Sequence, residues 1–174
     1  MDVELAPAGV AQLERVADRL AGAPLRAVYA STLRRSVQGA EQVAKRHGLP
    51  VIQNAALREK HFGVWEGLTY EEVAERFPED WARWLADPPT LKPPGGETYL
   101  EMRERVLGAL AEIVAAHPAA EIALVGHGGV NRAILCHALG LDLKYVFRIE
   151  QDHGALNIID FFSDGMKVVK LLNG

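Results

Sequence analysis

A histidine flanked by glycines separates an apolar stretch from a helical pattern in the last third of the chain. Residues 124–132 read Leu-Val-Gly-His-Gly-Gly-Val-Asn-Arg, which places His127 at the carboxyl end of a predicted strand. Glycine lets backbone amides approach an anion closely, and the first turn of the following helix presents free N–H groups. The segment therefore favours phosphate binding by His127 and Gly128. A buried turn whose histidine only satisfies a hydrogen bond is the structural alternative.

Two arginines follow another predicted strand end. Residues 29–36 read Tyr-Ala-Ser-Thr-Leu-Arg-Arg-Ser, so Arg34 and Arg35 fall on the first turn of a helix. A guanidinium is a permanently charged, bidentate ligand for phosphate. One of the two arginines can face the same site as His127, whereas a solvated arginine pair at a helix start is the alternative.

A loop of charged and aromatic residues supplies a third candidate group. Residues 57–67 read Leu-Arg-Glu-Lys-His-Phe-Gly-Val-Trp-Glu-Gly. A carboxyl group beside a phosphate ester can stay protonated, because the dianion raises its pKa, and can then protonate the leaving oxygen. Glu59 is the candidate for this role, with an ordinary surface glutamate as the alternative. His61 and Trp65 are candidates for the lining of a substrate pocket.

These segments require a scaffold of alternating strands and helices. Such alternation predicts an α/β fold in three layers, helix/sheet/helix, with a mostly parallel central sheet and sites at the carboxyl ends of its strands. The helical pattern and prolines at 68–94 predict a small helical lid. We expect helices at 7–20, 33–46, 69–86 (broken near Pro78), 97–117 and 130–139, and strands at 25–29, 51–52, 122–125, 145–149, 155–161 and 167–172.

Composition narrows the class of protein. With 174 residues, 49% of them hydrophobic, one domain is expected. A net charge of -4 provides no field for a polyanion, so we expect no nucleic-acid partner. Cys136 lies in an apolar run and is expected to be a buried thiol. No apolar stretch approaches the roughly 20 residues of a membrane span, and no signal-peptide pattern opens the chain. We expect a cytoplasmic protein without a membrane partner, and leave a homodimer open.

Taken together, the motifs resemble those of the histidine phosphatase superfamily, whose fold is also called phosphoglycerate mutase-like. The resemblance implies that Arg35 binds phosphate, that Glu59 is the proton donor and that His127 belongs to the second histidine motif. With arginine and imidazolium supplying the charge, it implies no metal and no cofactor. Five ordered segments carry the resemblance over nearly the whole chain: 2–12, 31–36, 57–67, 94–98 and 126–129.

The family differs from this sequence in one respect. Its members open with a strand that ends in Arg-His-Gly, whose histidine attacks phosphorus, and we recognise no strand ending in that motif. We therefore expect residues 1–174 to be an N-terminally incomplete histidine phosphatase domain whose first strand is missing. None of the other histidines follows an apolar strand and precedes a glycine turn, so none is assigned as the nucleophile: His47, His61, His117, His137 and His153.

For a complete domain the resemblance implies a phosphomonoesterase with two in-line transfers. The phosphoryl group passes from substrate to histidine while Glu59 protonates the leaving oxygen, and water then displaces it with Glu59 as base. The short segment 68–94 and the tail 151–157 resemble small phosphatases of the α-ribazole or broad-specificity type, so the substrate is a small phosphorylated metabolite, with α-ribazole 5'-phosphate as one candidate. A phosphoglycerate mutase and a non-catalytic phosphate-binding module without a nucleophile are the alternatives.

Overall fold

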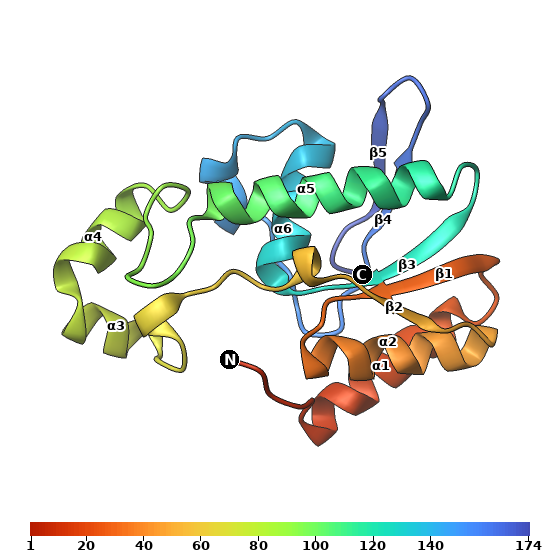
Figure 1. Cartoon of the computed structure of the whole chain (residues 1–174), viewed down its shortest axis with the longest axis horizontal. Coiled ribbons are helices and arrows are strands. Elements are labelled where there is room, and N and C mark those ends of the chain that lie inside the picture. The colour runs from red at the N-terminus through yellow and green to blue at the C-terminus, as the bar shows by residue number, and fades with distance from the viewer.

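The computed structural model describes all 174 residues and has a central sheet of three parallel strands in the order β2-β1-β3 (Figure 1). The strands are β1 (Leu25–Ala30), β2 (Val51–Gln53) and β3 (Glu121–Val125). Ala30, the last residue of β1, lies opposite Gln53 on one side and Val125 on the other. All three strands therefore end level with one another, so the loops that follow them start from one edge of the sheet.

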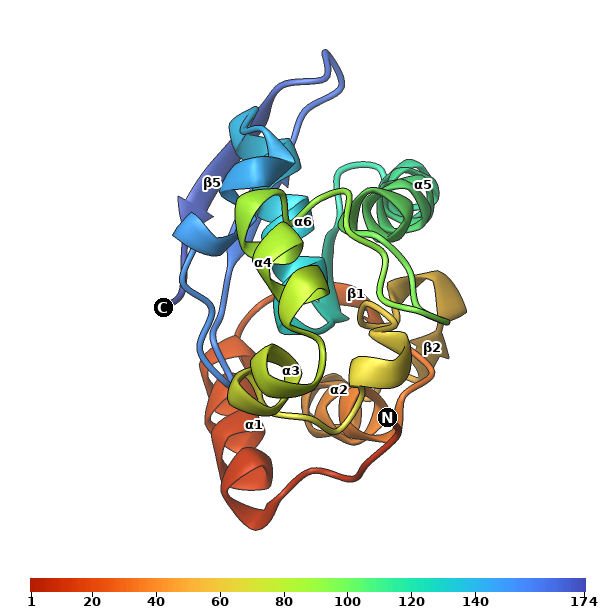
Figure 2. The same ribbon diagram turned by 90° about the vertical axis from the view of Figure 1, so that its left-hand side faces the viewer.

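Helices cover both faces of this sheet. Helices α1 (Pro7–Leu20) and α2 (Arg34–His47) lie on one face and α5 (Tyr99–Ala116) on the other (Figures 1 and 2). Helix α6 (Gly128–Leu139) follows β3 and packs against α5. The expected three-layer α/β fold is confirmed, and every helix expected from the sequence is present.

Local signals explain why the helix ends were predictable. Thr98 and Glu101 form a capping box at the start of α5, in which Glu101 N donates to Thr98 Oγ1 at 2.9 Å and Thr98 N to Glu101 Oε2 at 2.7 Å. Gly48 and Gly140 end α2 and α6 with φ of 64° and 66°, a left-handed conformation that costs glycine little.

Two short helices form the segment in which the sequence predicts a lid. Helices α3 (Tyr70–Arg76) and α4 (Pro78–Ala86) project from one end of the molecule, beyond the sheet (Figure 1). The break lies at Pro78, which occupies the first position of α4, where its missing N–H is harmless. Trp84 of α4 is buried, with its ring 5.0 Å from that of Phe147. The helices are confirmed, and their action as a lid stays a prediction.

One predicted strand is wrong. Residues 145–149 belong not to a strand but largely to a 3-10 helix, η3 (Leu143–Arg148). Asp142 starts it by accepting a hydrogen bond from Lys144 N at 2.9 Å. Leu143, Val146 and Ile149 are all buried and are spaced by three residues, the repeat of a 3-10 helix. The aromatic and β-branched residues of 145–149 favour a strand, whereas the three-residue spacing of the buried side chains is that of a 3-10 helix.

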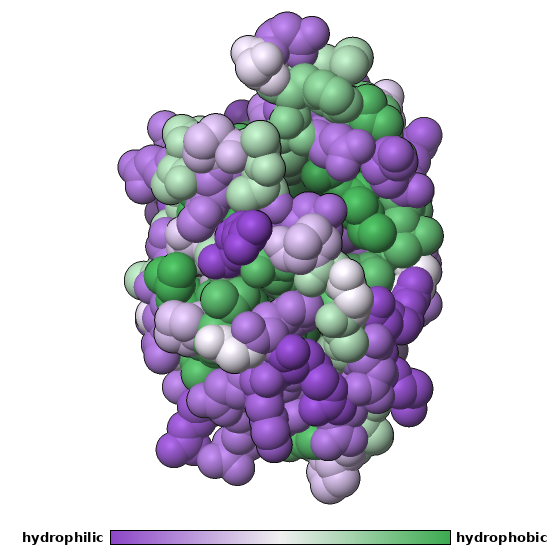
Figure 3. Space-filling view, turned by 90° about the vertical axis from the view of Figure 1, so that its right-hand side faces the viewer, coloured by the Kyte–Doolittle hydropathy of each residue, from purple (hydrophilic) through white to green (hydrophobic).

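The last two strands form a separate antiparallel hairpin, β4 (Ile158–Phe161) and β5 (Lys167–Leu171). Leu124 of β3 packs against the same core cluster as β4, but β3 pairs only with β1 and β4 only with β5. β3 and β4 therefore each have one edge without a strand partner. The side chains of β3 from Ile122 onward are only partly buried, which is unusual for a parallel strand. The face of the molecule opposite α3 and α4, on the right in Figure 1, shows hydrophobic patches among hydrophilic side chains (Figure 3).

Candidate active site

Hydroxyl groups join the ends of β1 and β3 at the carboxyl edge of the sheet. Ser31, directly after β1, is hydrogen-bonded through Oγ to Nε2 of His127 at 2.7 Å. Ser36 Oγ donates to Val125 O at 2.6 Å and accepts from Ser31 N at 3.0 Å. The two motifs predicted to share a site therefore meet, and the serines that join them were part of the quoted motif without an assigned role.

His127 is buried and uncharged at neutral pH. Burial, together with the positive charges of Arg35, Arg105 and Arg58, lowers the pKa of its imidazole to about 3. The imidazolium that we expected from the sequence therefore needs an additional anion nearby, and a phosphate dianion would supply it, since an opposite charge raises the pKa of a histidine. Protonation of His127 and phosphate binding should consequently favour each other.

The low pKa of His127 predicts an acid-sensitive fold. Between the ordinary histidine pKa of 6.5 and about 3, the unfolded chain binds a proton on this residue that the folded chain does not. Stability therefore falls as pH falls through this window, by up to about 1.4 kcal/mol per pH unit from this one group. In urea melts between pH 6.5 and 4.5 we expect His127→Gln to lose less stability than the unaltered chain. Parallel pH curves for the two proteins would contradict the buried neutral imidazole.

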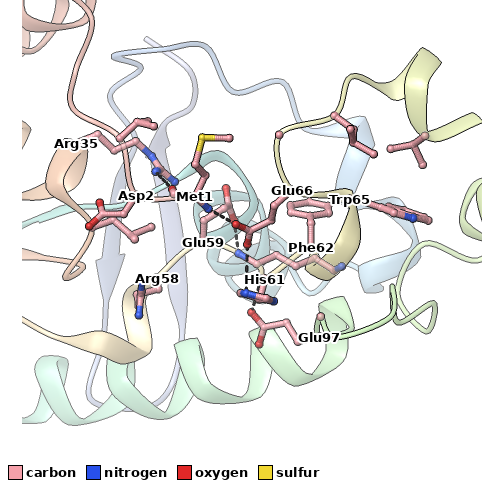
Figure 4. Close-up of a pocket in the computed structure, with 18 of the residues that line it drawn as sticks. Met1, Asp2, Arg35, Arg58, Glu59, His61, Phe62, Trp65, Glu66 and Glu97 are labelled. Atoms are coloured by element: carbon pink, nitrogen blue, oxygen red, sulfur yellow. Dashed lines mark hydrogen bonds and ion pairs between the residues drawn. The ribbon is translucent and has the colours of Figure 1, made fainter. Parts of the chain in front are cut away.

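An open pocket of about 1110 Å³ lies beside this edge, and the guanidinium groups of Arg35 and Arg58 line it (Figure 4). Arg35 Nη1 donates to Met1 O at 2.9 Å, and neither Arg35 nor Arg58 forms an ion pair with a carboxylate. His127 does not line the pocket itself, but the charges of both arginines reach it and lower its pKa. Two arginines without a carboxylate partner are suited to bind an anion from the pocket.

Glu59 reaches from its loop to the start of α6. Its Oε2 accepts a hydrogen bond from Gly129 N at 2.9 Å, and its Oε1 accepts one from Lys60 N at 2.9 Å. A Cβ at position 129 would overlap the Glu59 carboxylate, so glycine is needed there for this approach. The first-turn amide of Gly128 has no partner within the helix, because the first N–H groups of any helix lack one. The predicted proton donor and the predicted phosphate cradle are therefore neighbours.

The weaker pocket candidates differ in their surroundings. His61 lines the pocket with an exposed side chain, and its Nε2 lies 3.4 Å from Glu66 Oε1. Trp65 touches the pocket but is 5% exposed and belongs to the core, with its ring 6.4 Å from that of Trp84. Trp65 is therefore mainly a packing residue.

Sequence reasoning missed Lys60. This lysine lines the pocket but is 2% exposed, and its Nζ has no hydrogen-bond partner and lies 4.4 Å from the centroid of the Phe62 ring. Burial lowers its pKa to about 8, against the opposing effect of the neighbouring glutamates. No sequence signal separates such a lysine from a solvated one, because lysines in loops are usually exposed.

The remaining histidines lie away from the pocket. The tripeptide Arg46-His47-Gly48 has the letters of the family's nucleophile motif, but it ends α2, whose 14 residues span about 21 Å from the end that carries Arg35. His117 follows α5 and is hydrogen-bonded to Tyr29 Oη at 2.8 Å.

No cluster of His, Cys, Asp or Glu side chains is arranged to hold a metal ion. No helix has the length and apolar character of a membrane span.

Residues 1–174 match the family model described as histidine phosphatase superfamily (branch 1). The chain belongs to this superfamily. Phosphoserine phosphatase 1 of Hydrogenobacter thermophilus is 30% identical over 171 residues, which cover 98% of this chain and 81% of that protein. Two further relatives are named as phosphatases, the metal-independent phosphoserine phosphatase of Arabidopsis thaliana (36% identical) and the glucosyl-3-phosphoglycerate phosphatase of Mycolicibacterium vanbaalenii (32% identical). Together with the family match, these relatives identify the chain as a phosphatase.

Solved structures of other proteins agree with the fold. Bacillus stearothermophilus YhfR superposes with a TM-score of 0.91 at 27% identity, covering 98% of this chain and 84% of that one. The α-ribazole phosphatase of Shigella flexneri superposes with a TM-score of 0.88, covering 99% and 86%, but its identity of 23% supports a common fold alone. The fold class and the family expected from the sequence are thus both confirmed.

Proposed function

We propose that the protein is a phosphomonoesterase that hydrolyses a small phosphorylated metabolite through a phosphohistidine. The observation that carries this proposal is the meeting of two arginines, a glutamate and a histidine at one edge of the sheet. Arg35 and Arg58 line the pocket without carboxylate partners, and Glu59 is hydrogen-bonded to the start of α6 beside His127. Cationic donors around a phosphoryl group, with an acid for the leaving oxygen, are what phosphoryl transfer mainly needs.

Each group has a defined part in the proposed reaction, and Glu59 acts in both steps. Arg35, His127 and the amide of Gly128 bind the phosphoryl oxygens. A histidine nitrogen attacks phosphorus and the ester P–O bond breaks, while the Glu59 carboxyl gives its proton to the leaving oxygen. Water then attacks phosphorus in the phosphohistidine while Glu59 takes a proton from that water. The P–N bond breaks and inorganic phosphate is released.

None of the histidines in residues 1–174 is assigned as the one that attacks phosphorus. His127 is held through Nε2 by Ser31, and His61 stands beside Glu66 in an exposed loop. The free edges of β3 and β4 offer a position for one more strand. A strand that pairs in parallel with β3 would end level with His127, so we propose that the nucleophile belongs at the carboxyl end of such a strand.

Supplying that strand tests this part of the proposal. We expect the 174-residue chain, extended at its N-terminus by an apolar strand ending in Arg-His-Gly, to hydrolyse p-nitrophenyl phosphate about a hundredfold or more faster than residues 1–174 alone. The matched control carries alanine in place of the added histidine and should be as slow as the unextended chain. Equal rates for all three proteins would contradict a nucleophile at this place. An extended chain that binds phosphate without turnover would instead favour the non-catalytic alternative.

The substrate requires a direct comparison. The resemblance of segments 68–94 and 151–157 supports α-ribazole 5'-phosphate, and the name of the Hydrogenobacter relative suggests phosphoserine. Release of inorganic phosphate from each, measured as kcat/KM, would rank them. Isomerisation of 3-phosphoglycerate that depends on 2,3-bisphosphoglycerate would favour the mutase alternative. A cytoplasmic location and a lid action of α3 and α4 are part of the proposal.

A further inference from the structure

Arg105 of α5 binds the backbone of the loop that carries Glu59. Its Nη1 donates to Ala56 O and to Arg58 O, both at 2.7 Å, and its Nη2 donates to Glu59 O at 3.2 Å. A guanidinium is rigid and planar, so its donors hold these carbonyl groups in a fixed relation to one another. One side chain from a long helix thereby fixes both ends of the short segment that precedes the predicted proton donor.

Glu97 fixes Arg105 in turn. Its carboxylate accepts from Arg105 Nε at 3.0 Å and from Arg105 Nη2 at 2.5 Å, and it also accepts from His61 N at 2.9 Å. Burial acts to raise the pKa of Glu97, but the hydrogen bonds from Arg105 and from the His61 backbone outweigh it and lower the pKa. Glu97 therefore stays charged at neutral pH, and the ion pair with Arg105 persists.

Arg105 and Glu97 together form hydrogen bonds to the backbone of residues 56–61. Arg105 and Glu97 are partly exposed toward the pocket, with side chains 26% and 18% accessible. On the far side of this loop segment the Glu59 carboxylate meets Gly129 N, 70 positions away in the sequence. The loop is therefore held between α5 and the start of α6, and only Arg105 anchors it by side-chain bonds to its carbonyl groups.

We propose that Arg105, held by Glu97, is a positioning residue that places the Glu59 carboxyl against the first turn of α6. The role of Glu59 as proton donor rests on the proposed function, but the positioning is a statement about geometry and can be measured without turnover. Gly129 N–H is the reporter, because its chemical shift and its exchange with solvent depend on the hydrogen bond to Glu59.

The test compares variants of the 174-residue chain by NMR. In Arg105→Gln and in Glu97→Gln we expect the Gly129 amide to exchange with solvent about tenfold or more faster, and its chemical shift to change, because its hydrogen bond to Glu59 is lost. The control is Arg103→Ala on the same helix, which removes a positive charge but lies in another surface groove, away from the loop. Its Gly129 signal should match that of the unaltered chain.

The outcomes separate the two proposals. A folded Arg105→Gln or Glu97→Gln protein with an unaltered Gly129 signal would overturn the positioning role. If Arg105→Gln does not fold, Arg105→Lys decides, because lysine keeps the charge but cannot reach three carbonyl oxygens and Glu97 together; an unaltered Gly129 signal there would equally overturn it. A changed Gly129 exchange rate and shift in these variants, together with no hydrolysis of phosphate esters by the N-terminally extended chain, would refute the proposed function and leave the positioning role standing.

Discussion

Replacing Arg35 by alanine should weaken the binding of inorganic phosphate about a hundredfold or more. Arg35 lines the pocket, has no carboxylate partner, and acts on buried His127 through its charge. Losing a bidentate guanidinium removes two charge-assisted hydrogen bonds, each worth about 1.5 kcal/mol or more. Titration calorimetry with orthophosphate at pH 7 and low ionic strength measures the change on residues 1–174, without any need for turnover.

The neighbouring arginine is a matched control. Arg34 stands one residue earlier, is exposed, and pairs with Glu4 at 3.3 Å instead of lining the pocket. Arg34→Ala removes the same charge from the same helix start and should leave phosphate affinity within about twofold, since exposed charges are well screened. Equal losses in the two variants would show that only the general positive field matters, and unchanged binding in Arg35→Ala would place the anion elsewhere.

Replacing Glu59 by glutamine should lower turnover about a hundredfold or more for alkyl phosphates in a protein that carries the nucleophile. An alkoxide is a poor leaving group, so its departure depends on the proton that Glu59 supplies. Glutamine keeps the shape and can still face Gly129, but it has no proton to give. The measurement is kcat for glycerol phosphate with the unaltered and the Glu59→Gln forms of the extended chain.

The leaving group provides the control for this prediction. p-Nitrophenolate leaves readily without a proton, so the loss with p-nitrophenyl phosphate should be much smaller than with glycerol phosphate whenever bond cleavage limits the rate. A loss of the same size for both substrates would assign Glu59 to structure or to activation of water instead. Near-normal turnover of glycerol phosphate would remove Glu59 from the mechanism.

The three-layer fold, and a site shared by the segments that carry His127 and Arg35, could be predicted from the sequence because short-range signals encode the helices and strands. The glycines at 48 and 140 and the proline at 78 mark helix boundaries directly, and parallel strands bring their carboxyl ends to one edge whatever the details of packing. The prediction that His127 and Arg35 share one end of the sheet follows from this rule. The strand predicted at 145–149 is wrong because its aromatic and β-branched residues favour a strand locally, whereas the packing of the chain buries one side chain in three and selects a 3-10 helix.

The electrostatics of the site could not be predicted from the sequence. The neutral state of His127 depends on its burial and on arginines that come from three separate segments. The burial of Lys60 depends on the rings of Phe62 and Tyr99, and Tyr99 lies in a distant helix. Arg105 holds the Glu59 loop through hydrogen bonds to carbonyl groups that lie 46 to 49 positions earlier in the sequence. Such contacts exist only once the chain is packed, and residue type and spacing carry no sign of them.

A crystal structure of the protein with bound orthovanadate would show directly whether Arg35, His127 and Glu59 form a phosphoryl-transfer site. Vanadate adopts the geometry of a phosphoryl group in transfer. We expect the anion at the carboxyl edge of the sheet, with its oxygens within hydrogen-bond distance of the Arg35 guanidinium, the His127 imidazole and the Gly128 amide, and with the Glu59 carboxyl beside it. Vanadate bound elsewhere in the pocket, without contact to Arg35 and His127, would contradict the proposed phosphatase site.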